Sequence, residues 1–411
     1  MTIQEQKNIL DHCMANDIAL DEELVRRGYT YDDLRYESYS SKVALDAGAN
    51  AAEPIEAVHR FHDGIPAISF FSGAGGLDIG FELAGFHTLA SVELEEIFCN
   101  TQRLNWPDKP VIGPPLYSGN VKRHEEIAEA LRVETGIGFG FRGIFHGGPP
   151  CQPFSIAANQ RYNKNGENFK RRGFDDEDKG NLLFDYLWYI ETFRPLGFLI
   201  ENVEGLVELD GDGRIALSLA RLRGMGYSIS APQVINATFY GVPQNRKRCI
   251  IMGVLGDILP QLPTPSILPT SCKAVFERPL DNVGNHVTRK HSAASVLRYM
   301  KLAYGQRDHL GRVDRLDPNA PSKTVIAGGT KGGGRSHLHP YIPRTLSVRE
   351  CARLQTFPDD YVFTGSNARQ FTQVGNAVPP LLAYRLALAL KESLRQNHLL
   401  QEENHPHYGL G

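Results

Sequence analysis

A strand, a glycine-rich turn and a helix follow one another from residue 67, and this feature most constrains the fold. Residues 67–71 (AISFF) have the composition of a buried strand, residues 72–76 (SGAGG) form the turn, and apolar residues recur at helical spacing in residues 77–84. In such a unit the glycines let backbone N–H groups come close to a ligand, and the start of the helix carries partial positive charge. The turn therefore predicts a nucleotide-like ligand, although a purely structural turn has the same composition.

An acidic residue after the second strand narrows the class of ligand. Residues 87–92 have the pattern of a strand that ends at Glu93, about 20 residues beyond the turn, where a carboxylate can accept hydrogen bonds from both ribose hydroxyls. The turn lacks the Gly-x-Gly-x-x-Gly spacing, and no Gly-Lys-Ser/Thr follows it. A phosphate site is therefore less favoured than a site for an adenosyl ligand that bears a carboxylate.

Strands and helices continue to alternate along the chain. Further strands are expected at residues 143–145, 197–200 and 249–254, and helices at residues 182–193 and 215–223. This alternation predicts an α/β fold with a doubly wound sheet. After residue 254 the sequence becomes irregular and rich in proline, and helical patterns return at residues 346–354 and 381–394. The chain is thus expected to leave the α/β domain, form a second, smaller domain and return.

Charge is distributed unevenly between these segments, although the net charge is only −3. Residues 1–60 hold twelve Asp and Glu against six Lys and Arg, with a short helix expected at residues 21–28 and the start of another at Tyr31. A passive extension is favoured there over a module that binds a partner or DNA. Residues 273–335 hold twelve Lys and Arg against five Asp and Glu, which favours a nucleic-acid surface over a solvated basic face. The expected divisions are an N-terminal acidic helical extension and linker (1–60), a catalytic and cofactor-binding domain (61–256), a small domain (257–343), a return to the catalytic domain (344–395) and a C-terminal tail (396–411).

The cysteines give no sign of a metal site. They are scattered without a Cys-x-x-Cys pair, which argues against bound zinc or a disulfide framework and for a reducing cytoplasm. No uninterrupted apolar stretch approaches the ~20 residues of a membrane span, and the N-terminus lacks a signal-peptide pattern. We therefore expect a cytoplasmic protein with no metal and no membrane contact. The six cysteines are Cys13, Cys99, Cys151, Cys249, Cys272 and Cys351.

One of these cysteines lies in a segment that suits a nucleophile. Residues 147–155 (GGPPCQPFS) follow a short apolar run, and the two prolines fix φ ahead of Cys151, so that the thiol is held rigidly at the end of a strand. A small buried thiol in a proline-rich loop is the plainer interpretation. If Cys151 is a nucleophile, it could serve a thiol protease, a redox thiol, or addition to a pyrimidine ring. The first needs a positioned histidine, and His146 is too close in sequence to turn toward the thiol; the second needs a resolving cysteine, which is not nearby.

Addition to a pyrimidine needs a proton donor for the ring nitrogen and a cation for the ring oxygen, and candidates for both are present. Glu201 ends a buried strand, where desolvation would raise its pKa and let it donate a proton. A helix N-terminal acid is the alternative for this residue. Arg246 and Arg248 precede the strand at residues 249–254, and alternation places them on the same face as a pair of cations, whereas the alternative is a solvated basic run.

Six motifs, taken together, resemble those of the DNA cytosine-5 methyltransferases, in the same order along the chain. The resemblance covers roughly residues 67–255 and 340–395. The motifs are residues 71–76 (FSGAGG), 148–155 (GPPCQPFS), 201–203 (ENV), 244–248 (QNRKR), 349–355 (RECARLQ) and 373–380 (QVGNAVPP).

The resemblance implies a Rossmann-like S-adenosylmethionine-dependent methyltransferase fold, with a target-recognition domain at residues 257–343. Cys151 would attack C6 of a cytosine flipped out of duplex DNA, because neither C6 nor C5 can be approached inside the base stack. Glu201 would contact N3 and the exocyclic amine, and Arg248, supported by Arg246, would bind O2. Methyl transfer to C5 would leave S-adenosylhomocysteine and, after elimination, 5-methylcytosine.

The resemblance also implies binding residues. Cofactor contacts would fall on Phe71, Ser72, Gly73, Ala74, Gly76, Glu93, Asn120, Val121, Pro150, Leu182, Asn376 and Ala377. DNA contacts in the loop after the cysteine would fall on Gln152, Ser155, Arg161, Lys170, Arg171 and Arg172. The chain departs from the family in having Asn120 where an Asp is usual, and Leu94 where a bulky aromatic often follows the ribose-binding acid.

The implied partner is double-stranded DNA, bound by a monomer, with a restriction or phage-defence system as the cellular context. Two alternative functions are a methyltransferase that acts on tRNA and a DNA-binding subunit without catalytic activity. A tRNA methyltransferase of the same family usually carries Cys-Phe-Thr, which is absent from this chain. A catalytically silent DNA-binding subunit would not need Cys151, Glu201, Arg246 and Arg248 together.

Overall fold

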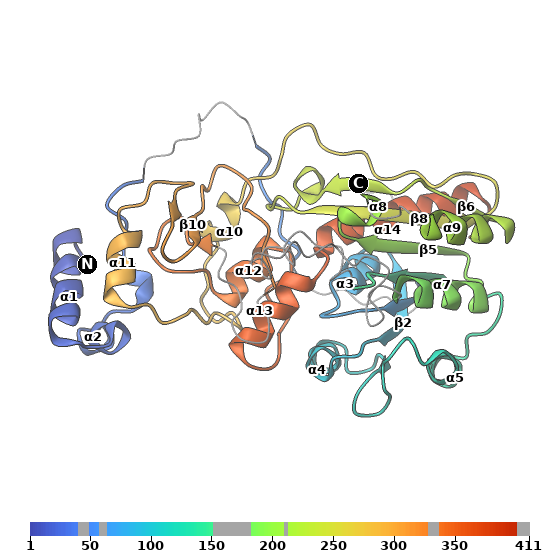
Figure 1. Cartoon of the computed structure of the whole chain (residues 1–411), viewed down its shortest axis with the longest axis horizontal. Helices are drawn as coiled ribbons and strands as arrows, with labels where there is room; N and C mark the ends of the chain where they lie inside the picture. Colours follow the sequence, from blue (N-terminus) through green and yellow to red (C-terminus); the bar gives the residue numbers. More distant parts are fainter. Residues whose placement is uncertain (40–48, 57–63, 151–181, 209–212, 328–336, 401–411) are drawn as a thin grey trace, which may run out of the picture.

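The computed structural model describes residues 1–39, 49–56, 64–150, 182–208, 213–327 and 337–400. Within these ranges, no helix is both long enough and apolar enough to cross a membrane. Two lobes and an N-terminal extension are seen in Figure 1, with the extension and the sheet of the larger lobe at opposite ends of the long axis.

The larger lobe is built on an eight-stranded mixed sheet with the order β3-β2-β1-β4-β5-β8-β6, in which β7 also pairs with β8. β1 to β5 run parallel to one another, whereas β8 runs antiparallel to β5, β6 and β7. The α/β sheet predicted from the alternation is confirmed, and its antiparallel end is an addition. The strands are β1 (Ile65–Phe70), β2 (Phe86–Val92), β3 (Val111–Ile112), β4 (Ile144–Gly147), β5 (Gly197–Asn202), β6 (Tyr227–Ile229), β7 (Gln233–Asn236) and β8 (Lys247–Leu255).

Helices cover both faces of this sheet because neighbouring strand residues point to opposite sides. Phe145 packs in a core with α5 (His124–Thr135), α7 (Leu182–Phe193) and α9 (Arg214–Gly224), whereas Ile144 packs in a core with α3 (Gly76–Leu83) and α14 (Pro380–Gln396). α3 and α14 cross closely at Gly80, where a Cβ would lie 2.4 Å from the Cβ of Ala383. The helices predicted at residues 182–193, 215–223 and 381–394 are therefore present. The remaining elements of this lobe are α4 (Glu96–Asn105), α8 (Gly205–Glu208) and the 3₁₀ turn η4 (Ala237–Tyr240).

The smaller lobe, residues 257–327 and 337–343, has little regular structure. A three-stranded sheet with the order β11-β10-β9 lies beside two short helices. The chain then returns through two helices that share a third apolar core with Trp106 of the larger lobe. The elements are α10 (Lys273–Glu277), α11 (Ala293–Tyr299), β9 (Arg307–Asp308), β10 (Val313–Arg315), β11 (His337–Leu338), and the returning helices α12 (Val348–Leu354) and α13 (Asn367–Asn376).

The N-terminal extension packs on the smaller lobe. It consists of α1 (Ile3–Asn16), α2 (Leu20–Arg26) and the 3₁₀ turn η1 (Tyr31–Asp33), so the element expected to begin at Tyr31 is a single turn. Leu10 and Leu24 of the extension share an apolar core with Val296 and Met300, and Figure 1 shows α1 beside α11. The extension is thus joined to the smaller lobe by a common core.

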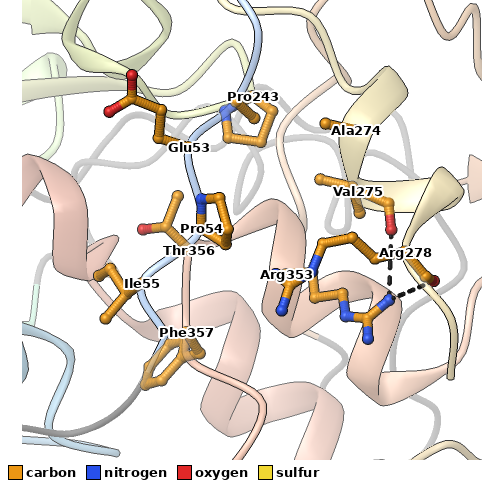
Figure 2. A pocket seen from close by; sticks show the side chains of 11 residues that line it. Glu53, Pro54, Ile55, Pro243, Ala274, Val275, Arg278, Arg353, Thr356 and Phe357 are labelled. Atoms are coloured by element: carbon orange, nitrogen blue, oxygen red, sulfur yellow. Dashed lines mark hydrogen bonds between the residues drawn. The ribbon is translucent and has the colours of Figure 1, made fainter. Parts of the chain in front are cut away.

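The described part of the linker is also held in place. The backbone N–H of Asn50 donates to the carbonyl of Pro269 (2.8 Å), and that of Ser271 donates to the carbonyl of Asn50 (3.0 Å). Figure 2 shows Pro54 and Ile55 lining a pocket with residues of α10 and of the segment after α12. Residues 49–56 therefore lie along the junction of the two lobes.

Candidate active site

The glycine-rich turn lies between β1 and α3, at the carboxyl end of the parallel strands. Phe71 (φ 52°), Gly73 (φ 55°) and Gly75 (φ 75°) all adopt left-handed backbone conformations, which is unusual for a phenylalanine. Neighbouring side chains hold this shape. Gln102 Nε2 donates to Ser72 Oγ (2.7 Å) and to the carbonyl of Gly73 (2.8 Å), and the Tyr361 hydroxyl donates to the carbonyl of Ala74 (2.6 Å).

The predicted ribose-binding acid lies against this turn. Glu93 follows β2, and its carboxylate accepts hydrogen bonds from the backbone N–H groups of Gly73 (2.7 Å) and Glu95 (2.8 Å). Burial of Glu93 raises the pKa of its carboxyl to about 7, even though these two donors act in the opposite direction. The turn and the acid, which are far apart in sequence, therefore form one site, because β1 and β2 are adjacent parallel strands.

Two of the other segments predicted to bind the cofactor contact this site. A Cβ on Gly119 would lie 1.9 Å from the carbonyl oxygen of Glu93, so the residue before Asn120 is in direct contact with the acid. A Cβ on Gly76 would lie 2.2 Å from the carbonyl oxygen of Val378, which places residues 377–378 on the first turn of α3. Asn376 is exposed and Ala377 is buried; Val121 is buried, Leu182 is half-buried and Pro150 is exposed.

A second group of residues lies at the ends of β4, β5 and β8. The Arg248 Nε lies 2.7 Å from Oε1 of Glu201, and the two side chains are only 15% and 11% exposed. A Cβ on Gly148 would lie 2.9 Å from Oε2 of the same carboxylate, and Asn202 Nδ2 donates to the carbonyl of Pro149 (3.3 Å). The segment that leads to Cys151 therefore runs directly beside the Glu201–Arg248 ion pair.

Cys151 itself lies outside the described residues. The same is true of all six predicted DNA-contacting residues, Gln152, Ser155, Arg161, Lys170, Arg171 and Arg172.

The two predicted arginines have different partners. Arg246 is 1% exposed, and its guanidinium donates to the carbonyls of Val325 (3.2 Å), Gly375 (2.9 Å) and Ala377 (2.9 Å). Burial lowers the pKa of this guanidinium. Only Arg248 of the pair contacts Glu201, whereas Arg246 joins the start of β8 to the smaller lobe and to the end of α13.

The sequence also led to predictions about the orientation of His146 and about bound metal ions. His146 is buried in β4 and stacks on Phe81 of α3 (ring centroids 4.2 Å apart), and burial lowers its pKa to about 4. The ring is thus packed against a helix, as expected for a histidine that does not face the thiol segment. Among the described residues, no group of three or more His, Cys, Asp or Glu side chains is arranged to hold a metal ion.

Several residues that shape the site were missed in the sequence. Gln102 and Tyr361 support the glycine turn from helix α4 and from the segment after α12, and Gly148 gives Glu201 its space. Nothing local distinguishes a glutamine in an amphipathic helix or one glycine of a pair, so only the tertiary contacts reveal these roles.

Comparison with known proteins gives a consistent result. The model of the family described as C-5 cytosine-specific DNA methylase matches residues 65–278 and 276–392. Type II methyltransferase M1.HphI of Haemophilus parahaemolyticus is 34% identical over 347 residues, which cover 79% of this chain and 86% of that protein. Type II methyltransferase M.PspPI of a Psychrobacter species is 30% identical over 402 residues (90% and 88%). Among solved structures, a prophage-encoded candidate DNA modification methyltransferase of Escherichia coli superposes with a TM-score of 0.64 at 25% identity, covering 80% of this chain and 99% of that one.

Proposed function

The chain belongs to the C-5 cytosine-specific DNA methylase family, and from this membership we propose how its residues transfer a methyl group. It is a DNA cytosine-5-methyltransferase, and its Type II relatives associate it with restriction-modification. Our proposal is that S-adenosylmethionine supplies the methyl group, that the acceptor is C5 of a flipped cytosine in a specific duplex sequence, and that Cys151 forms a covalent bond to C6 during the reaction.

The observation that carries the proposal is the Glu201–Arg248 ion pair beside Gly148. A pyrimidine that accepts a nucleophile at C6 gains electron density at N3 and O2, and it is stabilised by a donor at each position. Glu201 and Arg248 supply a carboxyl and a guanidinium 2.7 Å apart, largely screened from water, at the point where the chain turns toward Cys151. The pair therefore suits the N3 edge and O2 of one cytosine ring.

The chemistry can be followed on the residues of the chain. The Cys151 thiolate adds to C6 while Glu201 forms a hydrogen bond with N3 and Arg248 donates one to O2. The addition makes C5 nucleophilic. After C5 is methylated, loss of the C5 proton restores the double bond and expels the thiolate. A flipped base is required because the stacked base shields both ring atoms.

The glycine turn fits S-adenosylmethionine. A buried carboxyl beside a turn of left-handed glycines suits a ribose, because it offers acceptors for two hydroxyls, while the turn admits the backbone close to the ligand. We assign this role to Glu93 and the turn residues Phe71 to Gly76, with contributions from Asn120, Val121, Pro150, Leu182, Asn376 and Ala377.

The remaining assignments concern the organisation of the enzyme. We propose that residues 61–256 and 344–395 bind cofactor and carry out catalysis, that residues 257–343 recognise the DNA target, and that the loop residues after Cys151 contact phosphates. We further propose a monomer on DNA in the cytoplasm, paired with a cognate restriction or phage-defence system.

The mechanism is tested by removing the thiol. Cys151→Ser is expected to abolish transfer of label from S-adenosylmethionine to duplex DNA while duplex binding persists, and Cys13→Ala, a buried thiol of the extension, is the control. A 5-fluorocytosine duplex should trap a covalent adduct with the wild-type protein and the control but not with Cys151→Ser, because C5 then has no proton to lose. Wild-type turnover by Cys151→Ser would refute the nucleophile. Bisulfite sequencing of DNA from expressing cells would identify the target sequence.

A further inference from the structure

A carboxylate of the N-terminal extension lies at the point where three segments meet. Asp32 of η1 accepts a hydrogen bond from Arg344 Nε (2.6 Å) through Oδ1, and its Oδ2 lies 3.3 Å from Nε2 of His286. His286 belongs to the smaller lobe, and Arg344 belongs to the segment that leads from that lobe back to the catalytic domain. One side chain therefore connects the extension, the smaller lobe and the returning segment.

Arg344 passes this contact on to helix α12. Its side chain is 1% exposed, and its two terminal nitrogens each lie 2.8 Å from an oxygen of Glu350. Glu350 in turn accepts from the backbone N–H of Ser347 and forms the capping box at the start of α12. Asp32 is thus linked, through the buried side chains of Arg344 and Glu350, to the first turn of α12.

A second set of contacts joins the C-terminal part of the extension to the smaller lobe. The guanidinium of Arg315, in β10, is fully buried and lies over the rings of Tyr36 (3.5 Å from the centroid) and Tyr304 (4.2 Å). It donates to the carbonyls of Ser38 (2.7 Å) and Pro340 (2.9 Å). The extension therefore supplies one ring and one carbonyl to the surroundings of a buried arginine of the smaller lobe.

A passive appendage would not require this pattern of contacts. Burying charged side chains is costly unless every partner is present, and here the extension supplies partners for Arg344 and Arg315 at the base of the smaller lobe. Their common apolar core, with Leu10, Leu24 and Val296, adds non-directional attraction, but the charged contacts define one orientation.

We propose that the extension, residues 1–39, is a working part of the target-recognition lobe, and that Asp32 is a positioning residue that fixes the orientation of this lobe on α12 for duplex binding. This inference rests on the proposed role of the smaller lobe in DNA recognition. Asp32 acts through Arg344 and His286, so its loss should weaken productive DNA binding and leave the chemical step and the cofactor site unchanged.

The test compares two neighbouring aspartates in the full-length protein. Asp32→Asn removes the charge that faces Arg344, whereas Asp33→Asn removes the same charge from a carboxylate whose hydrogen bonds are local, to the N–H and hydroxyl of Thr30. For Asp32→Asn we expect KM for duplex DNA to rise roughly 3- to 10-fold, the range for losing a partly exposed, hydrogen-bonded ion pair. The kcat and the Kd for S-adenosylmethionine should stay within about twofold of wild type, and Asp33→Asn should match wild type.

Two results would overturn the inference. Unchanged KM in both Asp32→Asn and Asp32→Ala would show that the contact has no role in binding, and parallel loss of kcat, cofactor affinity and thermal stability would show a merely structural role. Arg315→Lys, which keeps the charge but loses the forked donor, should raise KM in the same way as Asp32→Asn. Amide hydrogen exchange of α11 in the Asp32 and Asp33 variants reports on the contact between the extension and the smaller lobe, even if the wild-type protein methylates no DNA. Failure of the proposed function and failure of this inference are therefore distinguishable.

Discussion

Gly148 offers the sharpest test of the geometry around the cytosine pocket. Its backbone is not in the left-handed region, so an alanine there is not strained by its φ angle. Among the described residues, the only obstacle within 3.5 Å is the Glu201 carboxylate, whose Oε2 would lie 2.9 Å from the new Cβ. Gly148→Ala is therefore a change of one methyl group aimed at one functional carboxylate.

The size of the effect follows from the distance that the carboxylate must move. An ordinary contact begins at 3.4 Å, so Glu201 must shift by about 0.5 Å (3.4 − 2.9). It is not free to rotate away, because Arg248 Nε holds its other oxygen at 2.7 Å. A misplacement of about 1 Å of a catalytic group costs about 100-fold in rate, and half that displacement therefore predicts a loss of about tenfold in kcat.

The assay is single-turnover transfer of labelled methyl to a duplex that carries the target site. Gly148→Ala should lower the rate about tenfold, with S-adenosylmethionine affinity unchanged and thermal stability within about 1 kcal/mol of wild type. Gly138→Ala is the matched control, since a Cβ at Gly138 meets no atom of the described residues within 4 Å. A wild-type rate for Gly148→Ala would show that the position of Glu201 does not limit catalysis, and the pocket assignment would fail.

Two further predictions follow from Glu93 and Arg246. Because burial raises the pKa of Glu93 to about 7 from 4.5, its contribution to the free energy of unfolding is complete below pH 4.5 and is lost as pH rises through about 7. Ribose hydroxyls prefer the ionised form, so the Kd for S-adenosylmethionine should rise up to about tenfold per unit as pH falls below 7, and titration calorimetry of Glu93→Gln should show this dependence removed. The lysine of Arg246→Lys cannot donate to all three carbonyls that accept from the guanidinium of Arg246. This variant should therefore lower the free energy of unfolding by about 2–4 kcal/mol, measured by urea denaturation. A loss of less than about 0.5 kcal/mol would contradict the role of Arg246 at the lobe junction.

The sequence predicted the parts of the fold that have strong local patterns. Residues 182–193 form a helix with both ends as expected, because its apolar residues recur at helical spacing over three turns. β6 and β7 were not anticipated, since strands of three and four residues carry too little alternation to be distinguished from loops. The antiparallel direction of β8 was also invisible, because direction depends on the route of the chain and not on the residues of the strand.

The site could be predicted where its residues end strands and not where they depend on distant neighbours. The positions of Glu93 and Glu201 could be predicted because acids at the ends of buried apolar runs lie at the carboxyl edge of a parallel sheet. Arg246 and Arg248 looked equivalent in sequence, and only the structure separates the one that contacts Glu201 from the one that binds the carbonyls of residues 325, 375 and 377. The placement of the extension was likewise unpredictable, because Asp32 and Arg344 are brought together by tertiary packing alone.

The burial of Arg246 explains how the two ends of the site keep a fixed separation. Its guanidinium donates to the carbonyl of Ala377, and the next residue, Val378, lies against Gly76 at the end of the glycine turn, the proposed cofactor site. Two residues along β8 from Arg246, Arg248 holds Glu201 at the proposed cytosine pocket. A methyl group can pass between two ligands only if their sites are held at a set distance. An apolar side chain at position 246 would remove one donor from each of three carbonyls. A buried arginine is costly, but here it donates to three main-chain carbonyls from two segments, which accounts for its position in the junction and not in the pocket.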